Sequence, residues 1–299
     1  MAWLGTSELV SAVSNAGALG IIGSGSAPGS WVRDQIRKTR ERTDRPFGVN
    51  VLLLSPCVEE VIEVVLQEKP KAVTFGAGNP GACVPRFKEA GIRVIPVVAS
   101  VTLARRLERA GADAFVAEGM ESGGHIGEIT TMALVPQVVE AVGVPVVAAG
   151  GFADGRGLAA ALALGAQGVQ IGTRFVCAEE CIAHANYKRK IVEAKDRSTV
   201  VTGTSTGHPV RCLENRLTRL FQERERAGAP PEELEKMGEG KLHLAAILGD
   251  VENGSVMAGQ IAALVRDIKP AKDIVEGIVR EAEEVIRRLA ALPQPLSHV

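Results

Sequence analysis

Short apolar runs alternate with helical patterns over most of the first 180 residues. The runs are LGIIG from Leu19, FGVNVLLL from Phe47, AVTFGAG from Ala72, RVIPVVAS from Arg93, AFVAEG from Ala114, PVVAAGG from Pro145 and GVQIGTRF from Gly168. Most of them are apolar on both faces, which is typical of strands buried in a parallel sheet. Their alternation with helices at this spacing predicts a series of βαβ units.

The segments between the strands have helical spacing: CVEEVIEVVLQEK, TLARRLERAG, TMALVPQVVEAV and GRGLAAALALG. Glycine follows several of them, at Gly91, Gly111, Gly143 and Gly165, which predicts left-handed C-caps. Small polar residues and glycines gather at the C-terminal ends of the strands, where α/β barrels build their active sites. We therefore predict an α/β fold, a (β/α)8 TIM barrel.

The strand count leaves this barrel one short. Seven strands are visible, and the helical pattern SELVSAVSNAG precedes the first. MAWLG, residues 1–5, is then the frayed end of strand one or the loop after it. We expect the first strand to be truncated, and the natural product to begin roughly 15–20 residues upstream, the length of a strand and its lead-in.

The pattern changes after Phe175, and it predicts three regions. Residues 1–177 form the barrel domain, and residues 178–260 form a mostly helical insertion on the substrate side of the barrel. This insertion contains ECIAHANYKRKIVEA, VRCLENRLTRLFQERERAG and the polar link AGAPPEELEKMGEGK. Residues 261–299 form a C-terminal helix that packs on the barrel and a tail, PQPLSHV, that is expected to be mobile.

Composition excludes several classes of partner. A net charge of -1 gives no general attraction to nucleic acid or anionic membrane, and 3% aromatic residues disfavour a base-stacking surface. No apolar run has the length of a membrane span, and the start lacks the features of a signal peptide, so a cytoplasmic location is expected. The five cysteines suit reduced thiols. Cys177 and Cys181 lack a second ligand pair, so no metal site is predicted.

Two glycine-rich loops are candidates for binding a phosphate. AAGGFADGRG, from Ala148 to Gly157, and QIGTRF, from Gln170 to Phe175, follow the last two predicted strands. They would be the seventh and eighth loops of the barrel, which form the usual phosphate site of this fold, helped by helix N-termini. Asp154 is placed to cap the helix after the first loop. The alternative is that the glycines only allow tight turns.

A third glycine-rich segment, AEGMESGGHIGE from Ala117 to Glu128, carries one imidazole, His125. Such a loop can place a histidine in a cleft, where its near-neutral pKa suits proton donation. A structural or merely exposed histidine is the alternative. His208, in STGHPVR, lies beside a predicted turn and could line a substrate channel.

Together these motifs resemble the nitronate monooxygenase and 2-nitropropane dioxygenase family of flavoproteins, from MAW to SVMAGQ at Ser255–Gln260. Within this family the chain most resembles the FMN-dependent enoyl-[acyl-carrier-protein] reductases of the FabK type. The motifs that carry this likeness are AEGMESGGHIGE, AAGGFADGRG, GTRF and STGHPVR. Nitronate oxidisers usually have Gln and Ala where this chain has Glu118 and Ser122. Members of the family also carry a strand and a glycine pair before the methionine that is Met1 here.

The resemblance implies a barrel that binds FMN at its mouth. The positions that match the family's flavin-binding segments are Met1, Asn50, Glu118, Gly123, Gly151, Gln170, Gly172 and Thr173. His125 matches the family's active-site histidine. NADH or NADPH would be the co-substrate, and acyl-carrier protein bearing an enoyl chain the partner. Some such enzymes respond to a monovalent cation, for which the sequence identifies no ligands, and the oligomeric state is left open, a homodimer included.

Three hypotheses follow. The first is NAD(P)H-dependent reduction of 2-enoyl thioesters in fatty acid synthesis. The second is a nitronate monooxygenase that uses the same flavin and oxygen. The third is a phosphate- or flavin-binding module without catalysis. The sequence identifies neither the acyl chain length nor the preferred nicotinamide.

Overall fold

The structure is a computed structural model, and it describes residues 1–292 of the chain. The tail predicted from PQPLSHV lies outside the described residues. One parallel sheet forms the centre of the molecule. Its strands, in spatial order, are β1 (Gly20–Gly23), β2 (Phe47–Leu52), β3 (Ala72–Gly76), β4 (Arg93–Val98), β5 (Phe115–Glu118), β7 (Val146–Ala149) and β8 (Gly168–Gln170). Each predicted run supplies one of these strands, so the α/β prediction is confirmed.

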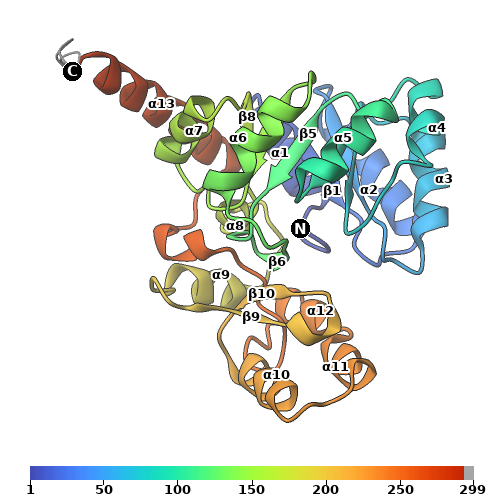
Figure 1. The fold of residues 1–299 in the computed structure, drawn as a ribbon, viewed down its shortest axis with the longest axis vertical. Helices are drawn as coiled ribbons and strands as arrows, with labels where there is room; N and C mark the ends of the chain where they lie inside the picture. Colours follow the sequence, from blue (N-terminus) through green and yellow to red (C-terminus); the bar gives the residue numbers. More distant parts are fainter. Residues whose placement is uncertain (293–299) are drawn as a thin grey trace.

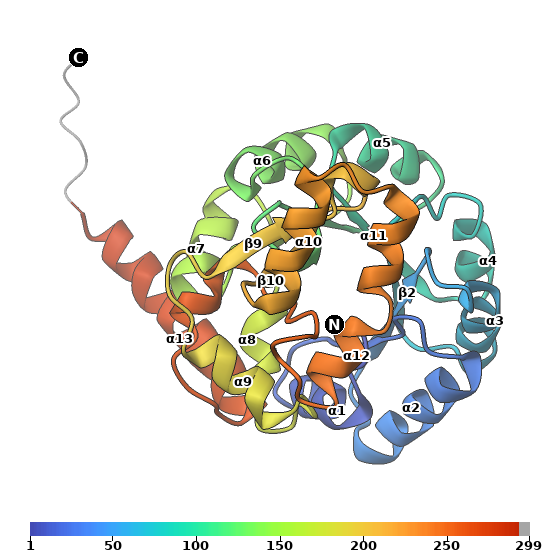
Figure 2. The ribbon, with the colours of Figure 1, turned by 90° about the horizontal axis from the view of Figure 1, so that it is seen from below.

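Helices surround the curled sheet as in a TIM barrel (Figure 2). They are α1 (Ser7–Asn15), α2 (Gly29–Arg42), α3 (Val58–Glu68), α4 (Val84–Glu89), α5 (Val101–Arg109), α6 (Thr131–Ala141) and α7 (Gly155–Ala163). The strands are buried because helices cover their outer face, as between Phe75 of β3 and Phe87 of α4, whose ring centroids are 5.4 Å apart. Left-handed glycines end α4, α5 and α7 as predicted.

The prediction for Gly143 is wrong. This glycine does not have a positive φ, and α6 ends at Ala141 with the chain already extended at Val142. Its N–H donates instead to the carboxylate of Glu108, at 2.6 Å. A neighbouring helix therefore supplies the acceptor that a left-handed turn would have supplied locally.

β1 and β8 are the two edges of the parallel sheet, and within residues 1–292 no ladder of hydrogen bonds joins them. Residues 1–5 form a turn near these edges, in which Gly5 donates its N–H to the Met1 carbonyl (2.9 Å). The carbonyl of Gly5 accepts from Gly23 at the end of β1 (3.0 Å). MAWLG is therefore a loop, which is the second of the two predicted alternatives.

The chain after β8 contains more than the helices that the sequence predicts. The helices are α8 (Thr173–Val176), α9 (Ala185–Val192), α10 (Arg216–Arg226), α11 (Pro231–Gly238), α12 (Lys241–Ala246) and α13 (Ala271–Ala290), with 3-10 turns at Thr204–Thr206 and Gln260–Leu264. Helices make up most of the regular secondary structure here, and α10, α11 and α12 lie in front of the barrel mouth in Figure 2. None of the helices in residues 1–292 is long and apolar enough to cross a membrane.

A small antiparallel sheet, here called the cap sheet, corrects the prediction that VRCLEN is helical. It contains β6 (Gly124–His125), β10 (Val210–Leu213) and β9 (Thr199–Thr202), in that order. The segment TVVTGTSTGHPVRCL is a hairpin pattern, with the β-branched run TVVT before Gly203 and Gly207 and the strand VRCL after them. Both glycines have positive φ, so the chain reverses just before Val210, and VRCL pairs as a strand where a helix was expected.

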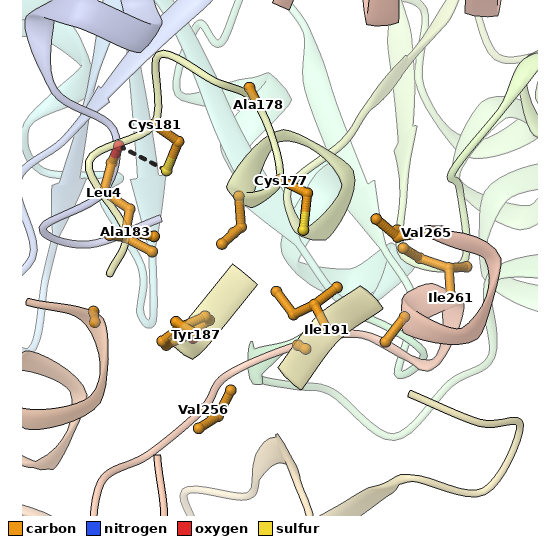
Figure 3. Close-up of a cluster of buried hydrophobic side chains, with 14 of the residues drawn as sticks. Leu4, Cys177, Ala178, Cys181, Ala183, Tyr187, Ile191, Val256, Ile261 and Val265 are labelled. Carbon is orange, nitrogen blue, oxygen red and sulfur yellow. Dashed lines mark hydrogen bonds between the residues drawn. The ribbon is translucent and has the colours of Figure 1, made fainter. Parts of the chain in front are cut away.

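An apolar cluster joins the start of the chain to the segments around the cap sheet (Figure 3). Leu4 packs there with Cys177, Tyr187, Ile191 and Val256, all buried. The Tyr187 hydroxyl donates to the Met257 carbonyl at 2.8 Å, which satisfies the only polar atom of this side chain. The cluster fixes the segment around residues 256–265 against the barrel, beside the loops described next.

The last long helix, α13, packs against α7 and α1 and extends away from the barrel (Figure 1). Gly155 at the start of α7 allows this approach, because a Cβ there would meet backbone and side-chain atoms of Ala282, Glu281 and Ile278. The N–H of Gly155 donates to the Glu281 carboxylate at 2.8 Å. α13 therefore caps α7.

Candidate functional site

Three neighbouring strands bring most of the predicted residues to one edge of the sheet. In the parallel register Glu118 of β5 lies opposite Ala149 of β7, and Ala149 lies opposite Gln170 of β8. The loops that follow these strands carry Gly123, Gly151 and Gly172. They therefore start side by side at the carboxyl edge of the sheet, where barrels carry out their chemistry.

The two predicted phosphate loops present backbone amides. Gly150 and Gly151 both have positive φ, and Gly172 precedes the first turn of α8. In the part of the chain that the structure describes, the N–H groups of Gly151, Gly172 and Thr173 have no hydrogen-bond acceptor. Adjacent unpaired amides at this edge are the donors that a phosphate group requires.

The N-terminus of α7 does not add to these donors. Asp154 accepts from Gly157 at 3.2 Å, which confirms the predicted cap, and Glu281 accepts from Gly155. Two carboxylates of the chain already occupy this end of the helix. An anion would therefore be held by the loop amides, and the help expected from a helix N-terminus is absent at α7.

The Thr173 side chain links the loop after β8 to a distant segment of the chain. Its Oγ1 accepts from the N–H of Gly259 at 2.9 Å, so the loop after β8 is tied to the SVMAGQ segment. The same segment packs on Gly123, where a Cβ would come within 2.5 to 2.7 Å of the Ala258 and Gly259 backbone. Gly123 is therefore required by a close backbone approach, and it holds the histidine loop beside the phosphate loops.

Glu118 and Ser122 are polar groups in low-dielectric surroundings at this edge. Burial raises the pKa of Glu118 to about 7, while the nearby N-terminal ammonium of Met1 acts in the opposite direction. The buried Ser122 hydroxyl lies close enough to the Glu118 carboxyl to lower its pKa slightly, although no hydrogen bond of ordinary geometry joins this hydroxyl to a partner among residues 1–292. A buried unpaired hydroxyl beside free amides fits a site that is completed by a bound polar molecule.

The Glu118 carboxyl gives a pH-dependent stability. Its pKa is about 7 when folded and 4.5 in its ordinary range, so the folded protein binds the proton more tightly. The contribution is complete below pH 4.5 and is lost as the pH rises through about 7, by roughly 3 kcal/mol at most. We expect urea unfolding of flavin-free protein to show this loss. Glu118→Gln should flatten the curve, and an equal pH slope in both proteins would contradict the assignment.

Met1 and Asn50 come from the N-terminal part of the barrel, before β1 and on β2. The Met1 side chain lies 3.7 Å from the position that a Cβ on Gly172 would take. The Met1 carbonyl packs on Gly23, which pairs with Asn50 in the register of β1 and β2. Asn50 itself donates to Thr74 Oγ1 at 2.9 Å, so it is linked to β3 and not directly to the loops after β5, β7 and β8.

His125 lies on β6, opposite Val210 of β10; part of its imidazole is open to solvent, and the surrounding protein removes water from the rest. Partial burial of the imidazole, and then the charge of His208, lower its pKa. A histidine that is mostly neutral at neutral pH is a hydrogen-bond donor and acceptor, and its protonated form is a stronger acid than usual. His125 is therefore suited to proton transfer in a substrate placed over the loops.

Sequence reasoning missed two charged residues that fix the histidine loop. Glu121 accepts from the N–H of Thr131 (2.9 Å) and from its hydroxyl (2.8 Å), which caps α6. The buried Arg211 donates Nε and Nη2 to the Met120 carbonyl, at 3.2 and 3.0 Å. Glu121 lies ten residues before Thr131, a spacing short enough to suggest a helix cap. Arg211 lies ninety-one residues after Met120, and a contact over that distance has no local sequence signal.

Loss of the Arg211 hydrogen bonds to Met120, here called the Arg211 clamp, should loosen the loop that carries His125. Arg211→Met removes two hydrogen bonds to Met120 and one to Thr199 Oγ1, at 3.3 Å. Hydrogen bonds from charged groups contribute about 1.5–3 kcal/mol, and removal of a desolvated charge offsets part of this, so we expect a net loss of about 1–3 kcal/mol in urea unfolding. Arg219→Met, which removes an exposed pair with Glu214, is the matched control and should cost under about 1 kcal/mol. Equal stability of the two variants would contradict the clamp.

Two surface cavities lie away from this edge. One, of about 430 Å³, is beside α9 and is lined by Lys190, Lys195 and Leu213 among others. The other, of about 340 Å³, lies between α7 and α13. Both are lined by oppositely charged side chains, and neither gathers the residues predicted to bind the cofactor.

A parallel α/β barrel with free amides in its last two loops and an imidazole on the neighbouring loop is typical of barrel enzymes that bind a phosphate group. Comparison with known proteins makes this class specific. The family model for nitronate monooxygenase matches residues 1–63 and 56–281. The chain belongs to the nitronate monooxygenase family.

Individual relatives cover almost the whole chain. FabK from Thermotoga maritima is 52% identical, with a TM-score of 0.95 over 98% of this chain and 94% of that one. A nitronate monooxygenase from Paraburkholderia phytofirmans is 33% identical over 97% of this chain and 92% of its own. The (3aS,4S,5R,7aS)-5-hydroxy-7a-methyl-1-oxo-octahydro-1H-indene-4-carboxyl-CoA dehydrogenase of Mycobacterium tuberculosis is 33% identical over 98% and 94%. Monooxygenases and dehydrogenases are oxidoreductases, and this chain is an enzyme of that class.

Proposed function

We propose that this protein is an FMN-dependent enoyl-[acyl-carrier-protein] reductase, which uses NADH or NADPH to saturate the 2-enoyl thioester of a growing fatty acid. The likeness to FabK, 52% identical with a TM-score of 0.95, carries this choice of reaction. Glu118 and Ser122 support it, since the nitronate oxidisers of the family usually have Gln and Ala at these positions.

The residues present suit an FMN. The unpaired N–H groups of Gly151, Gly172 and Thr173 would hold the phosphate, and the unpaired Ser122 hydroxyl would meet a polar edge of the ring. Met1, Asn50, Glu118, Gly123 and Gln170 complete the proposed flavin-binding set. When bound, the flavin would accept hydride from the nicotinamide and transfer it to the β-carbon of the thioester.

The chain's own task is orientation and proton supply. His125 would hydrogen-bond the thioester carbonyl or give a proton to the α-carbon. The helices α10, α11 and α12, in front of the barrel mouth, would exclude water while the substrate is bound (Figure 2). We further propose that residues 1–177 form the FMN-binding domain, that residues 178–260 form the substrate-side insertion, and that the C-terminal helix that follows them packs on the barrel.

The nitronate monooxygenase reaction is the second candidate, because the family model carries that name and a 33% identical relative shares it. Both reactions would use the same flavin, and they differ in the molecule that reoxidises it. An acyl thioester is supported by the name of the Mycobacterium tuberculosis relative, a carboxyl-CoA dehydrogenase, since a carboxyl-CoA is also a thioester.

An anaerobic titration separates the candidates. NADH should bleach the flavin of the purified protein, and crotonyl thioester on acyl-carrier protein should restore the colour quickly. Fast reoxidation by nitronate with oxygen, and slow reoxidation by the thioester, would favour the monooxygenase. A yellow protein that neither NADH nor NADPH bleaches would favour a binding module. The same assay can compare monovalent cations.

The expected partner is an acyl-carrier protein, and neither nucleic acid nor membrane is a proposed partner. A cytoplasmic location and a homodimer are part of the proposal. Cell fractionation and sedimentation of the flavin-loaded protein test these two points independently of the reaction.

A further inference from the structure

The helix α13 carries two apolar stripes, and the barrel covers only one of them. Ile274, Ile278 and Ala282 are buried on the side where α13 packs against α7 and α1. A second stripe, here called the outer stripe, is between 44% and 59% exposed and consists of Val279, Ile286, Leu289 and Leu292. The part of the chain that the structure describes therefore leaves an apolar face of this helix in water.

The outer stripe has the spacing of a seam between two helices. Val279 and Ile286 are seven residues apart and Leu289 follows three residues later, which are the a and d positions of a heptad repeat. Over this stretch α13 leaves the ring of helices and extends away from the barrel (Figures 1 and 2). Most helices in proteins are stabilised by packing of their apolar face, so the end of α13 needs a partner that residues 1–292 do not supply.

The charges beside the outer stripe change sign half-way along it. Glu283 and Glu284 lie before the middle of the stripe. Arg287 and Arg288 lie after it. The ion pairs that α13 forms within residues 1–292 do not include any of these four side chains. A second copy of the helix laid antiparallel brings each acidic half beside a basic half, whereas a parallel copy would set like charges together.

We propose that two copies of this chain associate through the outer stripes of their α13 helices, which pair antiparallel about a two-fold axis near Val285. Such a surface is self-complementary, because the same residues supply both sides of the contact. The inference rests on the homodimer that is part of the proposed function, and it names the surface that forms it. It does not depend on which substrate reoxidises the flavin.

The contact is short, so the dimer should be reversible. From Val279 to the end of α13 at Ala290 the stripe covers about 17 Å of helix, at 1.5 Å per residue. A helix pair of this length buries less than the roughly 1,600 Å² of a standard interface. We therefore expect a Kd in the micromolar range and a change from monomer to dimer between about 1 and 100 µM.

Sedimentation velocity of the purified full chain over this range tests the interface. Leu289→Glu places a carboxylate in the seam, and the Kd of the dimer should rise by about 10²–10³-fold, because a buried charge without a partner is costly. Leu220→Glu is the matched control, since Leu220 is a 42% exposed leucine on α10, at the opposite end of the molecule (Figure 1). The control should dimerise like the unmodified protein. Urea unfolding of both variants checks that each is folded.

Charge reversal tests whether α13 faces α13. Arg287→Glu with Arg288→Glu makes the charges beside the seam acidic throughout. Glu283→Arg with Glu284→Arg makes them basic throughout. Either variant alone should lose the dimer through repulsion of like charges, and an equimolar mixture of the two should restore it.

Three results would overturn the inference. A Leu289→Glu protein that dimerises like the unmodified chain would leave the proposed homodimer in place and move its interface elsewhere. A mixture of the two charge variants that stays monomeric would show that α13 does not face its own copy. An unmodified protein that is monomeric at the highest of these concentrations, and whose free energy of unfolding falls in Leu289→Glu, would assign the outer stripe to a segment of its own chain. The anaerobic titration decides the proposed reaction in every case.

Discussion

Gly151→Val and Gly172→Val should each yield folded protein that has lost its flavin. The two glycines lie in neighbouring loops, and their N–H groups have no acceptor within residues 1–292. A Cβ on Gly151 would have only Glu121 and Thr131 atoms near it, at 3.6 Å and beyond, and one on Gly172 would touch Met1 at 3.7 Å. The protein therefore has room for the new side chain, which would fill the space in front of the amides.

The expected effect is large because the amides act on a charged group. Each hydrogen bond to a charged acceptor is worth about 1.5–3 kcal/mol, so loss of two weakens binding by roughly 10²-fold or more. Flavin content per chain, from the absorbance of purified protein, and the Kd for added FMN measure this loss. Full flavin content in both variants would show that the phosphate lies elsewhere.

Two other glycines provide matched controls. Gly17 has φ +94° with no atom within 4 Å of its Cβ position, so Gly17→Val shares the backbone strain of Gly151→Val far from the site. Gly277 has an ordinary φ and open space, which matches Gly172. Strain at a left-handed residue costs about 1–3 kcal/mol, less than the stability of an ordinary domain. Flavin loss in the controls would assign the effect to unfolding.

The barrel was predictable from the sequence because its signals are local. Each parallel strand is a short apolar run followed by glycine or a polar residue, and all seven runs became strands of one sheet. The Asp154 cap likewise depends on residues only three apart, Asp154 and Gly157. These features need no knowledge of what the segment packs against.

The cap sheet was missed because its smallest strand has no pattern of its own. β6 is two residues long, Gly124 and His125, and it exists only because β10 pairs with it from far along the chain. Gly143 was assigned a left-handed cap that Glu108 makes unnecessary. Contacts between distant segments decided both cases, and a residue pattern within one window does not contain them.

The candidate site shows the same division. The glycine loops and His125 could be selected from their positions after strands. Glu121, Arg211 and the unpaired Ser122 became visible only when the loop was folded against α6, β10 and the SVMAGQ segment. Met1 and Asn50 came from a family resemblance; in the structure Met1 lies beside Gly172, and Gly23 links Met1 to Asn50.

His125→Ala should keep its flavin and lose most of its turnover. A positioned acid-base group contributes about 10²–10⁴-fold, and we expect a loss on this scale in the transfer from flavin to thioester. The cap sheet should survive, because β6 pairs with β10 through its backbone and the His125 side chain is exposed. The rate at which NADH bleaches the flavin should be close to that of the unmodified protein.

Val210→Ala is the matched control for this prediction. It shortens the side chain directly opposite His125 without removing a proton donor, so it reports any disturbance of the strand pair. Single-turnover rates of both half-reactions, measured for both variants, separate proton supply from packing. Restoration of the thioester step by added imidazole would identify proton transfer as the lost function. Near-normal turnover of His125→Ala, or an equal loss in Val210→Ala, would show that the imidazole takes no part in the reaction and that the glycine-rich loop serves only to bind the flavin.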